Sequence, residues 1–222
     1  MPLSPSMISK HLREQINIRG FADLGIIDET LDTPKLANLI GILEKLPGYQ
    51  KVQGIVPKRE EQSSKSSYSG NFGLGEFPLH TDLAHWHIPP RFILIRCIVP
   101  NPSIFTHIAS FSALINDLPS NIISRAMFTQ RRPINKRKFL MKFKQGNIYR
   151  WDSIFLLPTN AEGSYLFKVF NDLNSKHVMK ISLSEVGRTI ILDNWKMLHG
   201  RSECDALNCH RLIERAYLSE LF

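Results

Sequence analysis

The chain has 222 residues, of which 43% are hydrophobic and 22% charged, and its formal net charge is +8. This length and apolar content predict a single domain, residues 1–222, with a sizeable core. No apolar run approaches the roughly 20 residues that cross a bilayer, so we expect no membrane partner. Three cysteines without C-x-x-C spacing argue against a disulfide framework or a cysteine zinc site and favour a cytoplasmic setting.

The first 50 residues predict a lead-in of helical and strand pieces. Apolar residues at helical spacing indicate a helix over 6–18. A second helix is predicted to begin at Asp32, a capping residue that is soon followed by Pro34, and to end at 46–48. Its apolar stripe consists of Leu36, Leu39, Ile40 and Leu43. Residues 52–56 then predict a short strand.

Residues 57–76 are polar and rich in Gly and Ser, and they are too many for a plain connection. We interpret them as a lid loop over a site, with a simple polar excursion as the alternative. Directly after them come His80 and Asp82. In an extended chain these side chains point the same way, two residues apart, and supply two arms of a metal site.

The rest of the chain predicts many short strands. Two helices are predicted, and 165–173 fits either a helix or a strand. The strands are expected at 92–99, 105–108, 139–143, 147–151, 154–157, 178–183, 189–193 and 211–218, and the helices at 110–118 and 122–128. This order predicts a mainly β domain with flanking helices, built on a double-sheet jelly roll.

Much of the positive charge lies in a basic segment, residues 131–144. Charge runs of this kind usually form a solvated surface, which is the interpretation we adopt. One alternative is a non-enzymatic barrel that binds nucleic acid through this segment. A further alternative is a positive field that attracts an anionic small-molecule substrate.

A third metal ligand is indicated at His199, which follows an apolar strand and an Asp-Asn turn. Two histidines and one carboxylate make the facial triad of non-haem Fe(II) oxygenases, which leaves three coordination positions open. Farther on, Arg211 and Arg215 share one face of the last strand. Arginines that point into an apolar barrel need anions, so we expect a ligand anchor, with structural ion pairs as the alternative.

A zinc-dependent hydrolase is an alternative to the oxygenase, because His80, Asp82, His85 and His87 form a dense cluster of metal-binding residue types. In a strand, however, His85 and His87 face away from His80 and Asp82. We therefore expect the last two histidines to lie outside the metal site.

Three blocks, PLHTDLAHW, TIILDNWKMLHGRS and HRLIERAYL, together resemble the taurine dioxygenase (TauD/TfdA-like) family of Fe(II)/2-oxoglutarate oxygenases over residues 68–218. The resemblance implies a double-stranded β-helix (cupin-like) core in which His80, Asp82 and His199 hold Fe(II). It also implies that Arg211 binds the far carboxylate of 2-oxoglutarate, with help from Thr106. The usual Gly-Gly-x-Thr pattern is replaced by 103–106.

The same resemblance implies a dioxygenase that consumes O2, hydroxylates a C–H bond of a small molecule and releases succinate and CO2. Arg215 matches a family position that lies close to substrate anions. Together with the net positive charge of the chain, this match indicates an anionic substrate. Tyr68 and Asn71 in the lid loop are further candidates for substrate binding. No oligomeric state is predicted.

Overall fold

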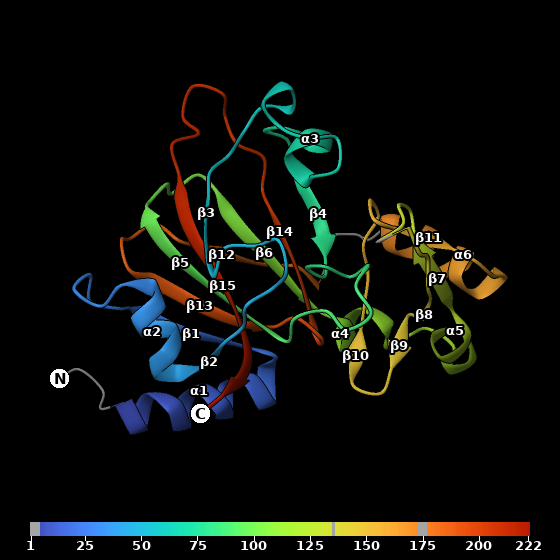
Figure 1. Cartoon of the computed structure of the whole chain (residues 1–222), viewed down its shortest axis with the longest axis horizontal. Coiled ribbons are helices and arrows are strands. Elements are labelled where there is room, and N and C mark those ends of the chain that lie inside the picture. Colours follow the sequence, from blue (N-terminus) through green and yellow to red (C-terminus); the bar gives the residue numbers. More distant parts are fainter. Residues whose placement is uncertain (1–4, 135, 173–176) are drawn as a thin grey trace.

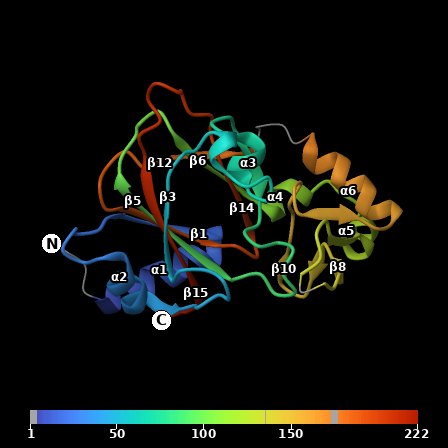
Figure 2. The ribbon, with the colours of Figure 1, turned by 45° about the horizontal axis from the view of Figure 1, so that its top comes forward.

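The computed structural model describes residues 5–134, 136–172 and 177–222. Two antiparallel sheets form the body of the molecule, and helix α1 (Pro5–Arg19) lies near the C-terminus at one side of it (Figure 1). A smaller lobe with helices α5 (Ser120–Arg125) and α6 (Ala161–Asn171) lies on the opposite side (Figures 1 and 2). Among the described residues, no helix is long and apolar enough to cross a membrane.

The main sheet follows the period of two that an extended chain imposes on its side chains. In β5 (Phe92–Val99), Ile93 and Ile95 point into the core between the sheets, and Phe92 and Leu94 point to the outer face. The spatial order of the sheet is β1 (Phe21–Ile26), β13 (Arg188–Asp193), β5 (Phe92–Val99), β15 (Leu212–Leu221) and β2 (Gly41–Leu43), with β3 (Val52–Ile55) also paired to β15.

The second sheet faces the main sheet and buries Ile108 and Ile181 against it. Its spatial order is β12 (Met179–Ser182), β6 (Phe105–Ser110), β14 (Met197–Arg201) and β4 (Phe77–His80). Apolar side chains from both sheets share one core, so the predicted double-sheet jelly roll is confirmed.

Helices α1 (Pro5–Arg19) and α2 (Thr33–Ile40) cover the outer face of the main sheet. The start of α2 is as predicted, because the Asp32 side chain accepts a 2.8 Å hydrogen bond from the Lys35 amide. Its predicted end at 46–48 is wrong. The helix stops at Ile40 and the next three residues pair with β15 as β2, an interaction that helical spacing cannot reveal.

The lobe packs around aromatic side chains, among them Phe111, Phe128, Trp151 and Phe170. The predicted helix over 122–128 is wrong in its second half, since α5 ends at Arg125 and the strand β7 (Met127–Gln130) follows. Residues 165–171 belong to α6, while 173 lies outside the described residues. The remaining elements of the lobe are α4 (Phe111–Ile115), β7 (Met127–Gln130), β8 (Leu140–Lys142), β9 (Lys144–Gln145), β10 (Ile148–Tyr149) and β11 (Leu156–Pro158).

Candidate metal centre

Strand register brings the two candidate histidines together. His199 in β14 lies directly opposite His80 in β4, and their ring centroids are 4.4 Å apart. The close approach needs a glycine at position 200, because a Cβ there would lie 2.5 Å from the Phe77 carbonyl oxygen. The sequence predicted that the turn before His199 brings it back beside the earlier strands, but it did not indicate that residues 197–201 form a strand paired with β4.

Asp82 lies two residues past the end of β4 and is held by the buried side chain of Asn194. The Asn194 amide accepts a 2.9 Å hydrogen bond from the Asp82 backbone N–H and donates to the carbonyl oxygens of Asp82 and Pro90, at 3.1 and 2.8 Å. Leu83 then turns the chain with φ of 55°. Asn194 therefore fixes the backbone of Asp82, a role that its position in a turn did not suggest.

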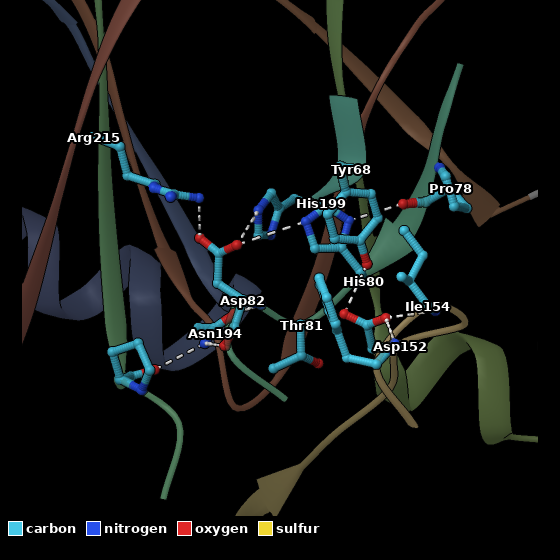
Figure 3. Close-up of polar contacts among 12 residues, drawn as sticks. Tyr68, Pro78, His80, Thr81, Asp82, Asp152, Ile154, Asn194, His199 and Arg215 are labelled. Atoms are coloured by element: carbon cyan, nitrogen blue, oxygen red, sulfur yellow. Dashed lines mark hydrogen bonds and ion pairs between the residues drawn. The ribbon is translucent and has the colours of Figure 1, made fainter. Parts of the chain in front are cut away.

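The three candidate ligands converge in the site (Figure 3). Asp82 Oδ1 lies 3.6 Å from His80 Nε2 and 3.7 Å from His199 Nε2. One ligand atom from each side chain lies within 4.8 Å of the others, and this is the one such group found in the described part of the chain. A 2.9 Å hydrogen bond between His80 Nδ1 and the Pro78 carbonyl turns Nε2 toward the site.

The second carboxylate oxygen of Asp82 has its own partners. Oδ2 accepts hydrogen bonds from Arg215, at 2.7 Å, and from the Tyr217 hydroxyl, at 3.0 Å. Burial raises the pKa of Asp82, but Arg215 and the two histidines outweigh this effect and hold the pKa well below its usual range. The carboxylate is therefore ionised, with Oδ1 left to face the imidazoles.

Arg211 is buried, with 6% of its surface exposed, and lacks a carboxylate partner among the described residues. Its guanidinium donates to the Ile104 carbonyl at 3.1 Å and to the Thr106 hydroxyl at 3.3 Å. Burial and the nearby Arg201 lower the pKa of Arg211 to about 10. A buried cation without a counter-charge is costly, so this position is suited to an anionic ligand.

Tyr68 packs directly on a candidate ligand. Its ring stacks on His80 with centroids 3.9 Å apart, and its hydroxyl donates a 2.8 Å hydrogen bond to Asp152 (Figure 3). The same carboxylate accepts the amides of Ile154 and Phe155, and burial raises its pKa to about 6. Tyr68 opens α3 (Tyr68–Phe72), so this contact ties the 57–76 segment to the centre.

A cavity of about 500 Å³ contains the three candidate ligands together with Arg211, Thr106, Arg215 and Tyr68. Asn71, a candidate for substrate binding, does not line it. Its amide donates to backbone carbonyls within the 57–76 segment, which also holds a 3-10 turn, η1 (Glu60–Gln62). His85 lines the cavity outside the ligand group, and His87 is exposed and lies outside the cavity lining.

Tyr217 and Asp152 were not predicted from the sequence as residues of the site. Tyr217 could have been found, because it follows Arg211, Ile213 and Arg215 at a spacing of two along the same strand face. Asp152 could not, since its place beside His80 depends on long-range pairing. The Thr81 amide donates to the Trp151 carbonyl at 2.8 Å, and the Trp151 amide donates to the Thr81 hydroxyl at 3.1 Å.

No family model and no curated protein matches the chain. Solved structures match it along nearly all its length. One is asparagine oxygenase in complex with Fe(II), (2S,3S)-3-hydroxyasparagine and succinate, with a TM-score of 0.73 and 14% identity over 97% of this chain and 80% of that chain.

Two other similar structures have the same overall fold. PvcB, an Fe, alpha-ketoglutarate dependent oxygenase from an isonitrile synthetic pathway, has a TM-score of 0.70 and 15% identity over 98% of this chain and 85% of that chain. A taurine dioxygenase from Burkholderia xenovorans has a TM-score of 0.66 and 13% identity over 98% of this chain and 83% of that chain. At these identities the likeness shows the fold, and the cupin-like double-stranded β-helix is confirmed.

Proposed function

We propose that this protein is an Fe(II)/2-oxoglutarate-dependent dioxygenase that hydroxylates a C–H bond of a small-molecule substrate and releases succinate and CO2. The observation that carries the proposal is the convergence of His80, Asp82 and His199 in a cavity that also holds Arg211, a buried cation without a counter-ion among the described residues. Structures of similar fold contain Fe(II), succinate and hydroxylated amino acids, which supports this choice of chemistry.

The donor set fits Fe(II). Two imidazole nitrogens and one carboxylate oxygen would hold the ion, and the cavity that these residues line would give small molecules access to it. When bound, Fe(II) with 2-oxoglutarate and O2 supplies the oxidant that attacks the substrate C–H bond. The protein holds the ligands in place. Arg215 and Tyr217 keep the Asp82 carboxylate ionised and oriented, and Pro78 orients His80.

Arg211 is the proposed anchor of 2-oxoglutarate. Its guanidinium provides donors in a fixed fork that matches a carboxylate, and the Thr106 hydroxyl beside it can join the same carboxylate. A dicarboxylate would neutralise the buried charge and reach from Arg211 toward the histidines that line the same cavity. The cavity of about 500 Å³ leaves room for a second small molecule beside this co-substrate.

The zinc hydrolase alternative receives no support, because His85 and His87 lie outside the group that includes His80 and Asp82. The carbonyl of His87 accepts a 3.0 Å hydrogen bond from the buried Arg150, which fixes the backbone of this stretch while the His87 side chain stays exposed.

The test is Fe(II)-dependent succinate formation from 2-oxoglutarate in the purified protein. We expect the His80→Ala, Asp82→Ala and His199→Ala variants to lose succinate formation and Fe(II) binding together. The His87→Ala variant is the matched control, since this exposed histidine lies nearby outside the ligand group, and it should retain both. Full activity in any of the three ligand variants would disprove the iron assignment.

A further inference from the structure

Four arginines line the cavity that contains the candidate metal ligands. Three of these arginines already have a protein partner or a proposed ligand. Arg215 binds Asp82 and Gln53, each at 2.7 Å. Arg201 donates to the carbonyl oxygens of Gly73 and Gly75, at 3.0 and 2.6 Å, and its guanidinium lies over the Phe77 ring. Arg211 is the proposed binding partner of 2-oxoglutarate.

Arg132 is the fourth arginine, and it differs from the other three. It is exposed at the cavity mouth, in the turn between β7 and β8, and the next two residues, Pro133 and Ile134, line the cavity with it. Within the described ranges, no hydrogen bond, ion pair or aromatic contact engages its guanidinium. Its charge is therefore available to a ligand.

A second cavity of about 290 Å³ adjoins the first, and Arg132 stands at the junction. Ser66, Arg132 and Phe155 line both cavities, so the two cavities share a wall at these residues. The second cavity is also lined by Arg131 and Lys65. Arg131 donates to the carbonyls of Ser153 and Ile154, and Lys65 pairs with Glu60 at 3.1 Å.

The acidic groups that line the main cavity are engaged by partners other than Arg132. Asp82 is engaged by Arg215 and Tyr217, and Asp152 accepts three hydrogen bonds from Tyr68 and two backbone amides. Apolar residues line the cavity around Arg132, among them Pro133, Ile134 and Phe155. Phe155 packs against Tyr68, whose ring stacks on the candidate ligand His80.

We propose that the primary substrate is an elongated molecule with an apolar middle and an anionic end group, a carboxylate, sulfonate or phosphate, that binds Arg132 at the junction of the two cavities. This inference rests on the proposed function, since it deepens the substrate class of the same site. It assigns the anion to the basic segment, while Arg215 serves Asp82. A bidentate contact with the guanidinium binds the anionic end group of the substrate. The apolar middle of the substrate packs against apolar residues of the cavity wall and extends toward the metal ligands.

The test uses hexanesulfonate as the anionic probe and 1-hexanol as its neutral counterpart. Binding is measured by calorimetry with the full chain, both metal-free and saturated with Mn(II) and 2-oxoglutarate, so that Arg211 is occupied in the second state. We expect hexanesulfonate to bind more tightly than hexanol, and Arg132→Gln to weaken it about tenfold without changing hexanol binding. Arg137→Gln is the control, because Arg137 belongs to the same turn but lines neither cavity.

An unchanged hexanesulfonate affinity in Arg132→Gln would overturn the inference. Equal losses in the two variants would overturn it too, because they would indicate a diffuse positive field. Calorimetry with 2-oxoglutarate alone tests the proposed function separately. If that co-substrate fails to bind while hexanesulfonate still depends on Arg132, the proposed function fails and the anion site stands.

Discussion

Arg215 and Asp82 form an ion pair of 2.7 Å inside the cavity, and because of this pair the two carboxylate oxygens of Asp82 have different roles. Oδ2 faces Arg215 and Tyr217, whereas Oδ1 faces His80 and His199. The carboxylate is thus held in one rotamer by partners on its far side. Its near oxygen is left for the proposed metal.

The Arg215→Gln variant should bind divalent metal more weakly, because the Asp82 carboxylate loses the partner that orients it. Loss of such an outer partner lowers metal affinity about 10- to 100-fold. The measurement is an anaerobic Fe(II) titration. Arg188→Gln removes a comparable ion pair, Arg188 with Asp23, away from the cavity and should leave the affinity unchanged. Equal affinities for the wild type and Arg215→Gln would contradict this role.

The Arg211→Gln variant should separate ligand binding from stability. We expect the dissociation constant of 2-oxoglutarate to rise about 10- to 100-fold, since hydrogen bonds to a charged group are lost. The ligand-free variant should be at least as stable as the wild type, because a buried, uncompensated charge has been removed. Calorimetry and chemical denaturation measure the two effects. A marked loss of stability with normal 2-oxoglutarate binding would show that Arg211 is structural.

The Gly200→Ala variant should disturb the centre through the backbone. The added methyl group would lie 2.5 Å from the Phe77 carbonyl oxygen, so β14 must move away from β4 and take His199 with it. We expect a loss of about 1–3 kcal/mol in the free energy of unfolding, together with weaker metal binding. Gly54→Ala is the control, because the nearest atom to its Cβ is a side-chain carbon at 3.5 Å.

The Asn194→Ala variant should be strongly destabilised even without metal. Three hydrogen bonds to the backbone of Asp82 and Pro90 are lost in a fully buried place, which predicts a decrease of about 2–4 kcal/mol in the free energy of unfolding. Urea denaturation of the metal-free protein measures it. Asn116→Ala, at an exposed position, should change the stability by less than about 0.5 kcal/mol.

The Tyr68→Ala variant should loosen the 57–76 segment. Tyr68 fastens α3 to His80 and Asp152, and trypsin sites at Lys58, Arg59 and Lys65 lie in the same segment. We expect faster tryptic cleavage there than in the wild type, because local opening becomes easier. Tyr68→Phe keeps the stacking and should lie between the two. Identical cleavage rates in all three proteins would refute the anchoring role.

Local chemistry explains which parts of the site could be predicted. His80 and Asp82 share a face through strand geometry, and Arg211 and Arg215 do so in the same way. Residue type therefore indicated both a metal site and an anion anchor. The structure brings Arg211 to Thr106, a candidate that the altered 103–106 pattern had weakened.

Long-range pairing explains the rest. Leu43 continues the helical stripe of α2, yet it lies in β2 because the preceding Gly41 and its neighbours pair with β15. Residues 197–201 form a strand only because β4 and β6 flank them on both sides. The same lack of tertiary information hid the placement of Asn194 beneath Asp82 and of Asp152 beside His80.

We propose that His80, Asp82 and His199 hold Fe(II) in a form that also binds 2-oxoglutarate. Anaerobic titration of the protein with both reagents, followed by visible absorption, tests it most directly. We predict a metal-to-ligand charge-transfer band that needs both Fe(II) and 2-oxoglutarate, is absent in Asp82→Ala and requires more 2-oxoglutarate in Arg211→Gln. A wild-type protein that binds Fe(II) without developing this band, or an Asp82→Ala variant that retains it, would contradict the assignment of these three residues as the iron ligands.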